Sequence, residues 1–294
     1  MQIYTLGTFP CVFKRYGRFF EAHKEAYLKI FKRSPKRMIK IHEGDFDIKN
    51  YLDKFPGDDP FVCRIASLFN AYRELIPFAD FWVQLDKNKE AVAALSRLGT
   101  QFVLYLTDKA DLEEIASFIR VAGATSLLMD GKYSLDLECK KETTGKIMRY
   151  IFPKPQLAEN DRVISPKLKD VYNLLAENFS NNSNLPDCES FCLDISFKQR
   201  RNTSRVCGIE DNDGNLVSCA MTVAETENCA IIGAVATGKK YRNKGFGTYM
   251  TKYITSQLFR EKKKIYLYRE ENKNEKFYNT AGYINCGTWK EIYF

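Results

Sequence analysis

The sequence predicts an α/β (α+β) protein with a mixed, mostly antiparallel central sheet flanked by helices, arranged as two tandem related domains. Two observations lead to this class. Residues 205–268 show two strand patterns around a tight Asp-Gly turn, followed by a strand, a helix and another strand. Residues 81–129 show the same order. Tight turns give antiparallel neighbours, whereas a strand, a helix and a strand in succession give a parallel pair.

Composition sets the broad class. A chain of 294 residues is long for one compact domain and natural for two. Its 45% hydrophobic and 14% aromatic content is sufficient for real cores. No run approaches the roughly 20 apolar residues that a membrane helix needs, and no leader pattern opens the sequence. We therefore expect a soluble, cytoplasmic protein without a membrane partner.

The nine cysteines are dispersed and form no Cys-x-x-Cys pair, and the sequence contains only two histidines. This pattern indicates reduced thiols, and it disfavours a zinc site. The net charge of +8 raises the alternative of a basic nucleic-acid-binding module. Lysine and arginine are spread over the whole length, however, and the densest clusters lack interleaved aromatic residues. We expect a solvated basic surface and no specific nucleic-acid partner; the clusters are 32–37, 198–201 and 262–264.

The most informative stretch runs from 230 to 253. Residues 230–236 form a short apolar run that predicts a buried strand, and the apolar residues from Phe246 onward recur at helical spacing. The first N–H groups of a helix have no partner inside it and favour an anion. Gly245 and Gly247 leave the backbone accessible there, and Arg242 and Lys244 add positive charge. Taken alone, this motif also fits a plain strand-to-helix turn with solvated lysines.

A second motif follows in the expected place. Residues 264–268 predict a strand, and a short helix carrying Phe277 and Tyr278 then closes on Gly282-Tyr283. In this order and spacing, the strand, the Arg-x-x-Gly-x-Gly loop, the helix, the strand and the Phe-Tyr helix resemble the acyl-CoA-dependent N-acetyltransferases of the GNAT superfamily. The resemblance is strong over the second half and weak over the first. It implies an acetyltransferase-like fold and an N-acetyltransferase that uses acetyl-CoA.

The first half lacks the cofactor motif. Asp108, Asp111, Glu113 and Glu114 precede and open its helix, where no glycine pair occurs, and four carboxylates would repel a diphosphate. We interpret residues 1–155 as a degenerate acetyltransferase-like domain without a cofactor loop, and residues 156–294 as the acetyltransferase domain. A linker with two prolines, 152–156, separates them.

Several helices and strands outside the motifs are also expected. In the first half these are a strand at 2–6, a helix at 20–31 and a helix from Pro60, capped by Asp58 or Asp59. In the second half we expect a helix capped by Ser165 with Pro166 in its first turn, and another helix over 189–198. The resemblance implies that this second pair helps to wall the acceptor site.

The resemblance also implies roles for individual positions. Backbone groups of Val235, Ala236 and Thr237 would align the pantetheine arm and polarise the acyl carbonyl. Asn272 and Asn274 are candidates for bonding the same arm, although the asparagine that often opens this motif falls at Glu271. Backbone amides would grip the diphosphate from Arg242, Asn243, Lys244, Gly245, Phe246, Gly247 and Thr248.

Acyl transfer to an amine needs a proton acceptor and a proton donor, because an aliphatic amine with a pKa of about 10.4 arrives protonated. Glu225 and Glu227 are the acidic residues closest in sequence to the expected site, although carboxylates beside a turn are commonly solvated. Tyr278 stands where the superfamily often places a proton donor to the thiolate; the alternative is a core aromatic side chain.

The second half contains no histidine that could activate Cys229 or Cys286 as a nucleophile, so direct attack by the amine in a ternary complex is favoured. The identity of the acceptor and the oligomeric state stay open. A retained second copy that shapes a pocket favours a small-molecule amine. The alternative function is a non-enzymatic acyl-CoA-binding or scaffold protein.

Overall fold

The computed structural model describes residues 38–40, 48–72, 79–153, 163–179 and 185–294. The strand expected at 2–6, the helix expected at 20–31 and residues 154–156 of the expected linker lie outside these ranges. In chain order the elements are β1 (Met38–Lys40), α2 (Ile48–Leu52), α3 (Pro60–Tyr72), β2 (Ala79–Leu85), β3 (Ala91–Leu98), β4 (Gln101–Leu106), α4 (Leu112–Ala122), β5 (Ser126–Asp130), β6 (Lys141–Tyr150), β7 (Val163–Ile164), α5 (Leu168–Phe179), α6 (Cys188–Arg200), β8 (Val206–Glu210), β9 (Leu216–Glu225), β10 (Cys229–Thr237), the 3-10 turn η1 (Lys239–Tyr241), α7 (Phe246–Arg260), β11 (Lys264–Glu270), α8 (Glu275–Thr280) and β12 (Tyr283–Tyr293).

The described strands form one continuous sheet that repeats its own order. From one edge inward it runs β1-β2-β3-β4-β5-β12, and from the other edge it runs β7-β8-β9-β10-β11-β6. In both series the fourth and fifth strands are parallel and are joined through a helix, α4 or α7. The remaining pairs are antiparallel. The predicted fold class, a mostly antiparallel mixed sheet in two related halves, is confirmed.

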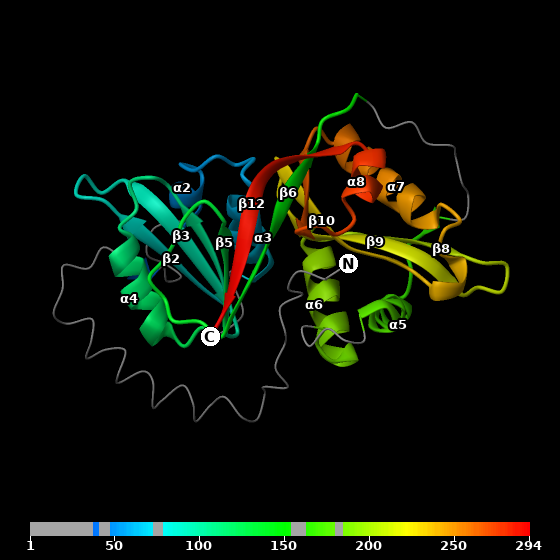
Figure 1. Cartoon of the computed structure of the whole chain (residues 1–294), viewed down its shortest axis with the longest axis horizontal. Coiled ribbons are helices and arrows are strands. Elements are labelled where there is room, and N and C mark those ends of the chain that lie inside the picture. Colours follow the sequence, from blue (N-terminus) through cyan, green and yellow to red (C-terminus); the bar gives the residue numbers. More distant parts are fainter. Residues whose placement is uncertain (1–37, 41–47, 73–78, 154–162, 180–184) are drawn as a thin grey trace.

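The last strand of each half lies against the other half. β12, at the end of the chain, pairs with β5, whereas β6, from the first half, pairs with β11. The two strands also pair with each other along the whole of β12, with one register shift. Figure 1 shows β12 in red and β6 in green crossing the middle of the molecule. The sheet therefore continues across the predicted division at residue 155, and that division stays a prediction.

A tryptophan fills the junction of the two halves. Trp289 on β12 is fully buried, and its indole Nε1–H donates to the carbonyl oxygen of Arg269 on β11 at 3.0 Å. Gly145 on β6 lies between them, directly opposite Trp289. A Cβ on Gly145 would stand 2.0 Å from the Arg269 carbonyl oxygen and 2.5 Å from the indole ring. The junction therefore accepts no side chain at position 145.

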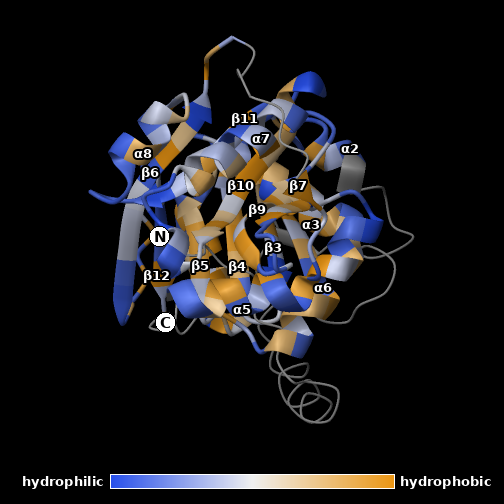
Figure 2. Ribbon diagram, turned by 90° about the vertical axis from the view of Figure 1, so that its right-hand side faces the viewer, coloured by the Kyte–Doolittle hydropathy of each residue, from blue (hydrophilic) through white to orange (hydrophobic). Residues whose placement is uncertain are grey.

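Helices cover both faces of the sheet. In the second half α7 packs with Ile232 and Val235 on one face, and α5 and α6 pack with Ala234 on the other. α3 joins the halves, because Phe61 packs with residues of β10 and β11 while other α3 side chains pack with Phe81 of the first half. Figure 2 shows mostly hydrophobic strands in the interior and helices of mixed hydropathy around them.

The cap predicted for α3 is confirmed for Asp59, whose Oδ1 accepts the N–H groups of Phe61 and Val62 at 2.8 and 3.1 Å. The start predicted for the helix after the linker is wrong. α5 begins at Leu168, and the carbonyl of Lys167, not of Ser165, accepts its first helical bonds. The physical reason is the short edge strand β7, which pairs with β8 up to Ile164 and leaves buried Pro166 packed over β8 before the helix can start.

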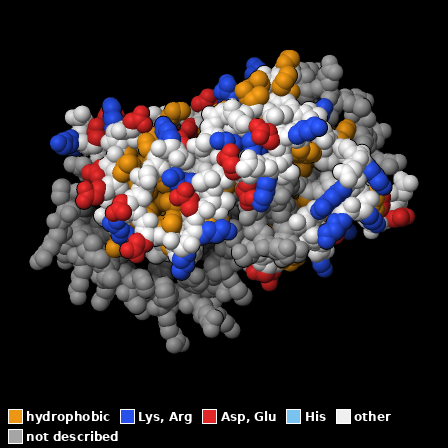
Figure 3. Space-filling view, viewed as in Figure 1, with side chains coloured by type: hydrophobic (Ala, Val, Ile, Leu, Met, Phe, Trp, Pro, Cys, Tyr) orange, Lys and Arg blue, Asp and Glu red, His pale blue; other side chains and the backbone are white. Residues whose placement is uncertain are grey.

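The surface carries charges of both signs. Figure 3 shows acidic and basic side chains interspersed on the left of the view, where the first half of the chain lies. Within the described ranges there is no cluster of three or more side chains suited to a metal ion. No described helix has both the length and the apolar character needed to cross a bilayer.

The packing around Trp289 predicts that alanine substitutions at two glycines of the central strands differ sharply in their effect on stability. Gly145→Ala should lower the free energy of unfolding by about 3 kcal/mol or more, because the added methyl group meets backbone and indole atoms that cannot move independently. Gly287→Ala is the matched control, since its Cβ would make only ordinary contacts of 3.7 Å with Ile147; it should cost less than about 1 kcal/mol. Chemical denaturation of both variants measures this. Equal costs would show that the junction is not tightly packed around Trp289.

Candidate functional site

The N-terminus of α7 differs from those of α4 and α6. Asp111 caps α4 by accepting the Glu114 N–H, and Asp187 caps α6 by accepting the Ser190 N–H. α7 has Gly245 at this position and no side-chain cap. Its first N–H groups therefore have no partner from a capping side chain, and they carry the positive end of the helix dipole.

Glycines shape this helix start. Gly245 has φ +85°, a left-handed conformation, and the space beside it is open. Gly247 has an ordinary φ, but a Cβ there would lie 3.2 Å from Thr237 Oγ1 and 3.6 Å from the Phe277 ring. The first glycine is thus required by the backbone conformation, and the second keeps a narrow space open between α7, β10 and α8.

The loop before α7 is basic, exposed and anchored from several sides. Arg242 donates from Nη2 to Asn178 Oδ1 on α5 at 2.6 Å. Tyr241 donates its hydroxyl to Asp211 Oδ2 at 2.5 Å, and the Lys244 ammonium lies 5.7 Å from the centre of the same tyrosine ring. These contacts anchor the loop to α5 and to the turn after β8. Lys239, Lys240, Arg242 and Lys244 are all exposed.

β10 leaves its parallel neighbour before it reaches this loop. The ladder between β10 and β11 ends at the pair Ile232–Leu267, although both strands continue. Beyond that point β10 pairs with β9 through a bulge in which Ala234 has φ +49°. In the described chain, the β11-facing edge of β10 has no ladder partner from 233 to 237. Val235, Ala236 and Thr237 lie on this segment, and Thr237 Oγ1 hydrogen-bonds Ser218 Oγ at 2.8 Å.

The structure brings Tyr278 close to these elements. It lies on α8, is 4% exposed, and belongs to the same core cluster as Val235 and α7. Burial raises the pKa of its hydroxyl well above the ordinary value, so the group is protonated at neutral pH. Its ring contacts the rings of Phe277 and Tyr283 at centroid distances of 5.0 and 6.4 Å. Both interpretations of Tyr278, as a proton donor and as a core side chain, agree with this position.

Asn272 and Asn274 lie in the exposed turn between β11 and α8 and both have positive φ, 60° and 56°. Asparagine tolerates this conformation better than most residues, so the turn alone accounts for both. Glu271, where the family pattern often has an asparagine, lies 3.4 Å from Lys146 of β6 in an ion pair. Whether the two asparagines bond a ligand stays a prediction.

Glu225 lies far from the loop, at the other end of β10. It pairs in the sheet with Ala230, and Thr237 stands seven residues further along the strand, on the order of 20 Å away. The carboxylate is 2% exposed and accepts two bonds from Arg205, at 2.8 and 2.7 Å, and one from Lys263 at 3.0 Å. This distance from the loop argues against Glu225 as the base. Glu227 is exposed in the neighbouring turn.

The corresponding place in the first half is filled. The parallel ladder of β4 and β5 also ends before either strand does. Here the Tyr133 hydroxyl bonds the Leu106 carbonyl at 3.3 Å and Asp108 Oδ1 at 2.6 Å. The side chain of Gln84 bonds both the N–H and the carbonyl of Asp111 at the start of α4. This geometry agrees with the interpretation that the first half holds no nucleotide.

No pattern in the sequence indicated the residues that support the loop. Asn178, Asp211 and Ser218 anchor Arg242, Tyr241 and Thr237 from three different elements. Their polar side chains are common residue types in loops and strands, and only the folded chain brings them together.

Comparison with protein families decides the assignment of the second half. Residues 168–283 match the model of the acetyltransferase (GNAT) family. Residues 168–283 form a GNAT acetyltransferase domain. The match includes the basic loop, α7 and α8, and it extends as far as the first residue of β12. The resemblance expected from the two motifs is confirmed for this region.

Solved structures extend the likeness of fold to both halves of the chain. A tandem GNAT protein from the clavulanic acid biosynthesis pathway matches with a TM-score of 0.57 and 13% identity, covering 86% of this chain and 96% of that one. A Drosophila protein matches with a TM-score of 0.59 and 11% identity, covering 87% and 98%. A GCN5-related N-acetyltransferase from Sphaerobacter thermophilus gives 0.54 and 13%, covering 87% and 95%. A comparison with curated proteins found no match.

The residues at the start of α7 fit the diphosphate of a CoA thioester. The N–H groups of the GNAT domain's α7 have no capping side chain, Gly245 and Gly247 leave the backbone accessible, and four exposed cations surround the loop. A diphosphate carries the charge that both the dipole and the cations attract. The unpaired edge of β10 begins beside this point and offers backbone groups to an extended arm.

The position of Glu225 predicts a structural role. Glu225→Gln should lower the free energy of unfolding by about 1 to 3 kcal/mol, because Arg205 and Lys263 then keep only the more exposed Glu261 as a counter-charge. Glu227→Gln, in the adjacent exposed turn, is the matched control and should change it by less than about 0.5 kcal/mol. Urea denaturation and calorimetric titration with CoA check this: CoA affinity should be equal in both variants. A Glu225→Gln protein of normal stability would contradict the structural role.

Proposed function

We propose that the chain is an N-acetyltransferase that moves an acetyl group from acetyl-CoA to an amine acceptor by direct attack in a ternary complex. The observation that carries this proposal is the uncapped start of α7, directly after a strand that has parted from its neighbour. Acetyl-CoA supplies the activated acyl group. The protein would contribute binding and orientation of the two reactants and transfer of protons.

The proposed binding roles follow the geometry. Backbone amides from Arg242 to Thr248 would hold the diphosphate at the positive end of α7. The free edge of β10, at Val235, Ala236 and Thr237, would pair with the amide groups of the pantetheine arm and orient the acyl carbonyl. Holding both reactants in place can lower the barrier by on the order of 7 kcal/mol in favourable cases.

Tyr278 is proposed as the proton donor to the departing sulfur. The C–N bond forms as the C–S bond breaks, and the proton that the amine nitrogen loses passes to water. Burial keeps its hydroxyl protonated at neutral pH, which a donor requires. It lies in one core cluster with Val235 of the parted strand and with α7, which carries the proposed diphosphate site. We further propose that the first half is a degenerate copy that holds no cofactor, and that the acceptor is a small molecule that binds where the two halves meet.

Calorimetric titration with CoA and acetyl-CoA tests the cofactor site. The native chain should bind both, and Gly245→Ala together with Gly247→Val should weaken binding at least tenfold, because a side chain enters the space that the phosphates need. Gly214→Ala is the matched control: it has φ +79° and open space, as Gly245 does, but it lies in the turn between β8 and β9. It should leave the affinity unchanged. An unchanged affinity of the double variant for CoA and acetyl-CoA would contradict the proposed cofactor site.

Replacing Tyr278 with Phe tests the donor role. The variant should keep its CoA affinity and lose on the order of 100-fold in kcat, since general acid catalysis typically contributes about 100- to 10,000-fold. Release of free thiol from acetyl-CoA in the presence of amines measures turnover. An unchanged kcat would remove the donor role. If CoA binds but no amine releases thiol, the chain is a non-enzymatic acyl-CoA-binding protein instead.

A further inference from the structure

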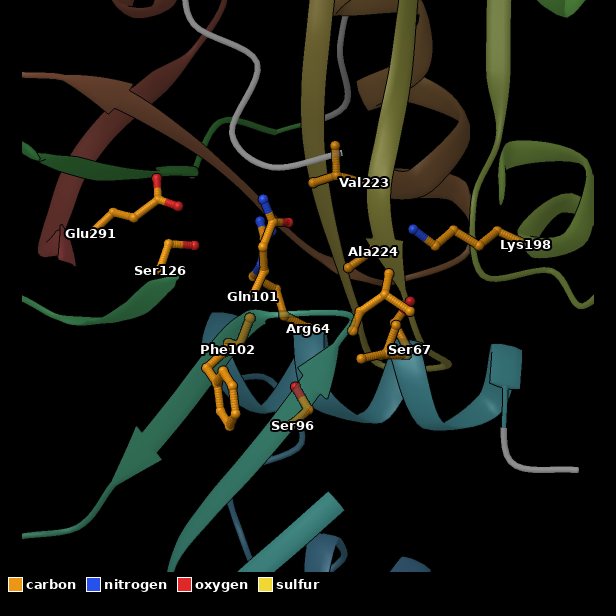
Figure 4. A pocket seen from close by; sticks show the side chains of 13 residues that line it. Arg64, Ser67, Ser96, Gln101, Phe102, Ser126, Lys198, Val223, Ala224 and Glu291 are labelled. Atoms are coloured by element: carbon orange, nitrogen blue, oxygen red, sulfur yellow. The ribbon is translucent and has the colours of Figure 1, made fainter. Parts of the chain in front are cut away.

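A cavity lies between the two halves of the molecule, beside α3. Its walls come from α3, β3, β4 and β5 of the first half and from α6, β9 and β12 of the second. Figure 4 shows Glu291 and Ser126 entering from one side and Lys198 from the other, with Arg64 and Gln101 between them. None of these residues belongs to the cofactor motifs.

The cavity reaches the point where β10 and β11 part. One of its walls is Val223, and a Cβ on Gly233 would lie 2.6 Å from the Val223 side chain. Gly233 is the first residue of β10 beyond the last pair with β11. Another wall is Arg64, whose guanidinium carbon lies 5.7 Å from the ring centre of Tyr268, the first residue of β11 beyond that pair. Only the side chains of Val223 and Arg64 thus separate a ligand in the cavity from the point where β10 and β11 part.

The polar groups of the cavity are arranged for a ligand with donors and a negative charge. Ser96 and Glu291 are 1% and 2% exposed, and Ser96 Oγ, Gln101 Oε1 and Glu291 Oε1 have no hydrogen-bond partner among the described residues. Buried oxygens without partners are costly in a folded protein, so a site that keeps three of them together is suited to bind N–H or O–H donors. The Arg64 guanidinium adds a cation that pairs well with a carboxylate.

The size of the cavity limits the ligand. Its volume is about 60 Å³, whereas one water molecule needs about 10 to 15 Å³ measured in the same way. The space therefore holds a handful of non-hydrogen atoms. Lys198, at the far wall, is paired with Asp194 at 2.8 Å. The other charged side chains that line the cavity are Arg64 and Glu291, one of each sign, and they attract each other.

We propose that this cavity is the acceptor site, and that the acceptor is a small amine that also carries a carboxylate, such as an amino acid. Its carboxylate pairs with Arg64, and its N–H groups donate to Ser96, Gln101 and Glu291. The proposal rests on the proposed acetyl transfer and adds the class of acceptor. It also gives the first half a function, because that half contributes three of these four residues.

Matched acceptor pairs test the proposal with the full chain. Glycine, L-alanine and L-serine are compared with methylamine, ethylamine and ethanolamine, their decarboxylated counterparts, by thiol release from acetyl-CoA. At least one amino acid should be used with a kcat/KM tenfold or more above that of its counterpart. Glu291→Gln should lower that kcat/KM at least tenfold while the Kd for CoA stays within twofold. Glu142→Gln, an exposed carboxylate on the neighbouring strand β6, is the control and should change neither value.

The possible outcomes separate this proposal from the proposed function. If CoA binds and no amino acid is preferred over its counterpart, or if Glu291→Gln leaves the preference intact, the acceptor site is wrong and the cofactor site stands. If CoA does not bind, the proposed function fails. Saturation-transfer NMR of the same amino acids with the protein alone then tests whether the cavity binds an amino acid. The site is supported if the native chain gives a saturation-transfer signal and the Glu291→Gln variant, with unchanged thermal stability, does not. The absence of any signal from the native chain overturns the site.

Discussion

The ladder between β6 and β12 is the interaction on which the rest of the structure depends. Each of these strands ends one half of the chain and completes the sheet of the other half. Trp289 reaches across Gly145 to the carbonyl of Arg269, so β6 of the first half lies between two second-half strands that share one buried hydrogen bond. Neither half closes its own sheet, and each therefore depends on the other for the pairing of its fifth strand.

This exchange also positions the proposed chemistry. β11 is held along its second part by β6 on the opposite edge, so β11 stays paired in the sheet where β10 parts from it after Ile232. The same exchange brings Glu291 of the last strand beside Gln101 and Ser126 of the first half. The first half thus completes the sheet and forms one wall of the proposed acceptor site.

The sequence predicted the elements that have local signals. The Asp-Gly hairpin, the strand before the basic loop, α7 and the helix capped by Asp59 follow from turn chemistry, periodicity and capping. The two exchanged strands were not predicted. The first residues of β6 are polar or exposed, and β12 contains a glycine and a register shift, so neither alternates clearly. Their partners lie more than a hundred residues away. For the same reason the cavity, which joins positions from 64 to 291, had no signature in the sequence.

Native-state hydrogen exchange of the full chain tests most directly whether the exchanged strands make the two halves one unit. Amides of β3 and β4 in the first half and of β9 and β10 in the second are followed together as denaturant is added. The shared ladder predicts that both sets exchange through a single opening, with the same free energy and the same dependence on denaturant. Two openings with clearly different free energies, one for each half, would contradict the central claim.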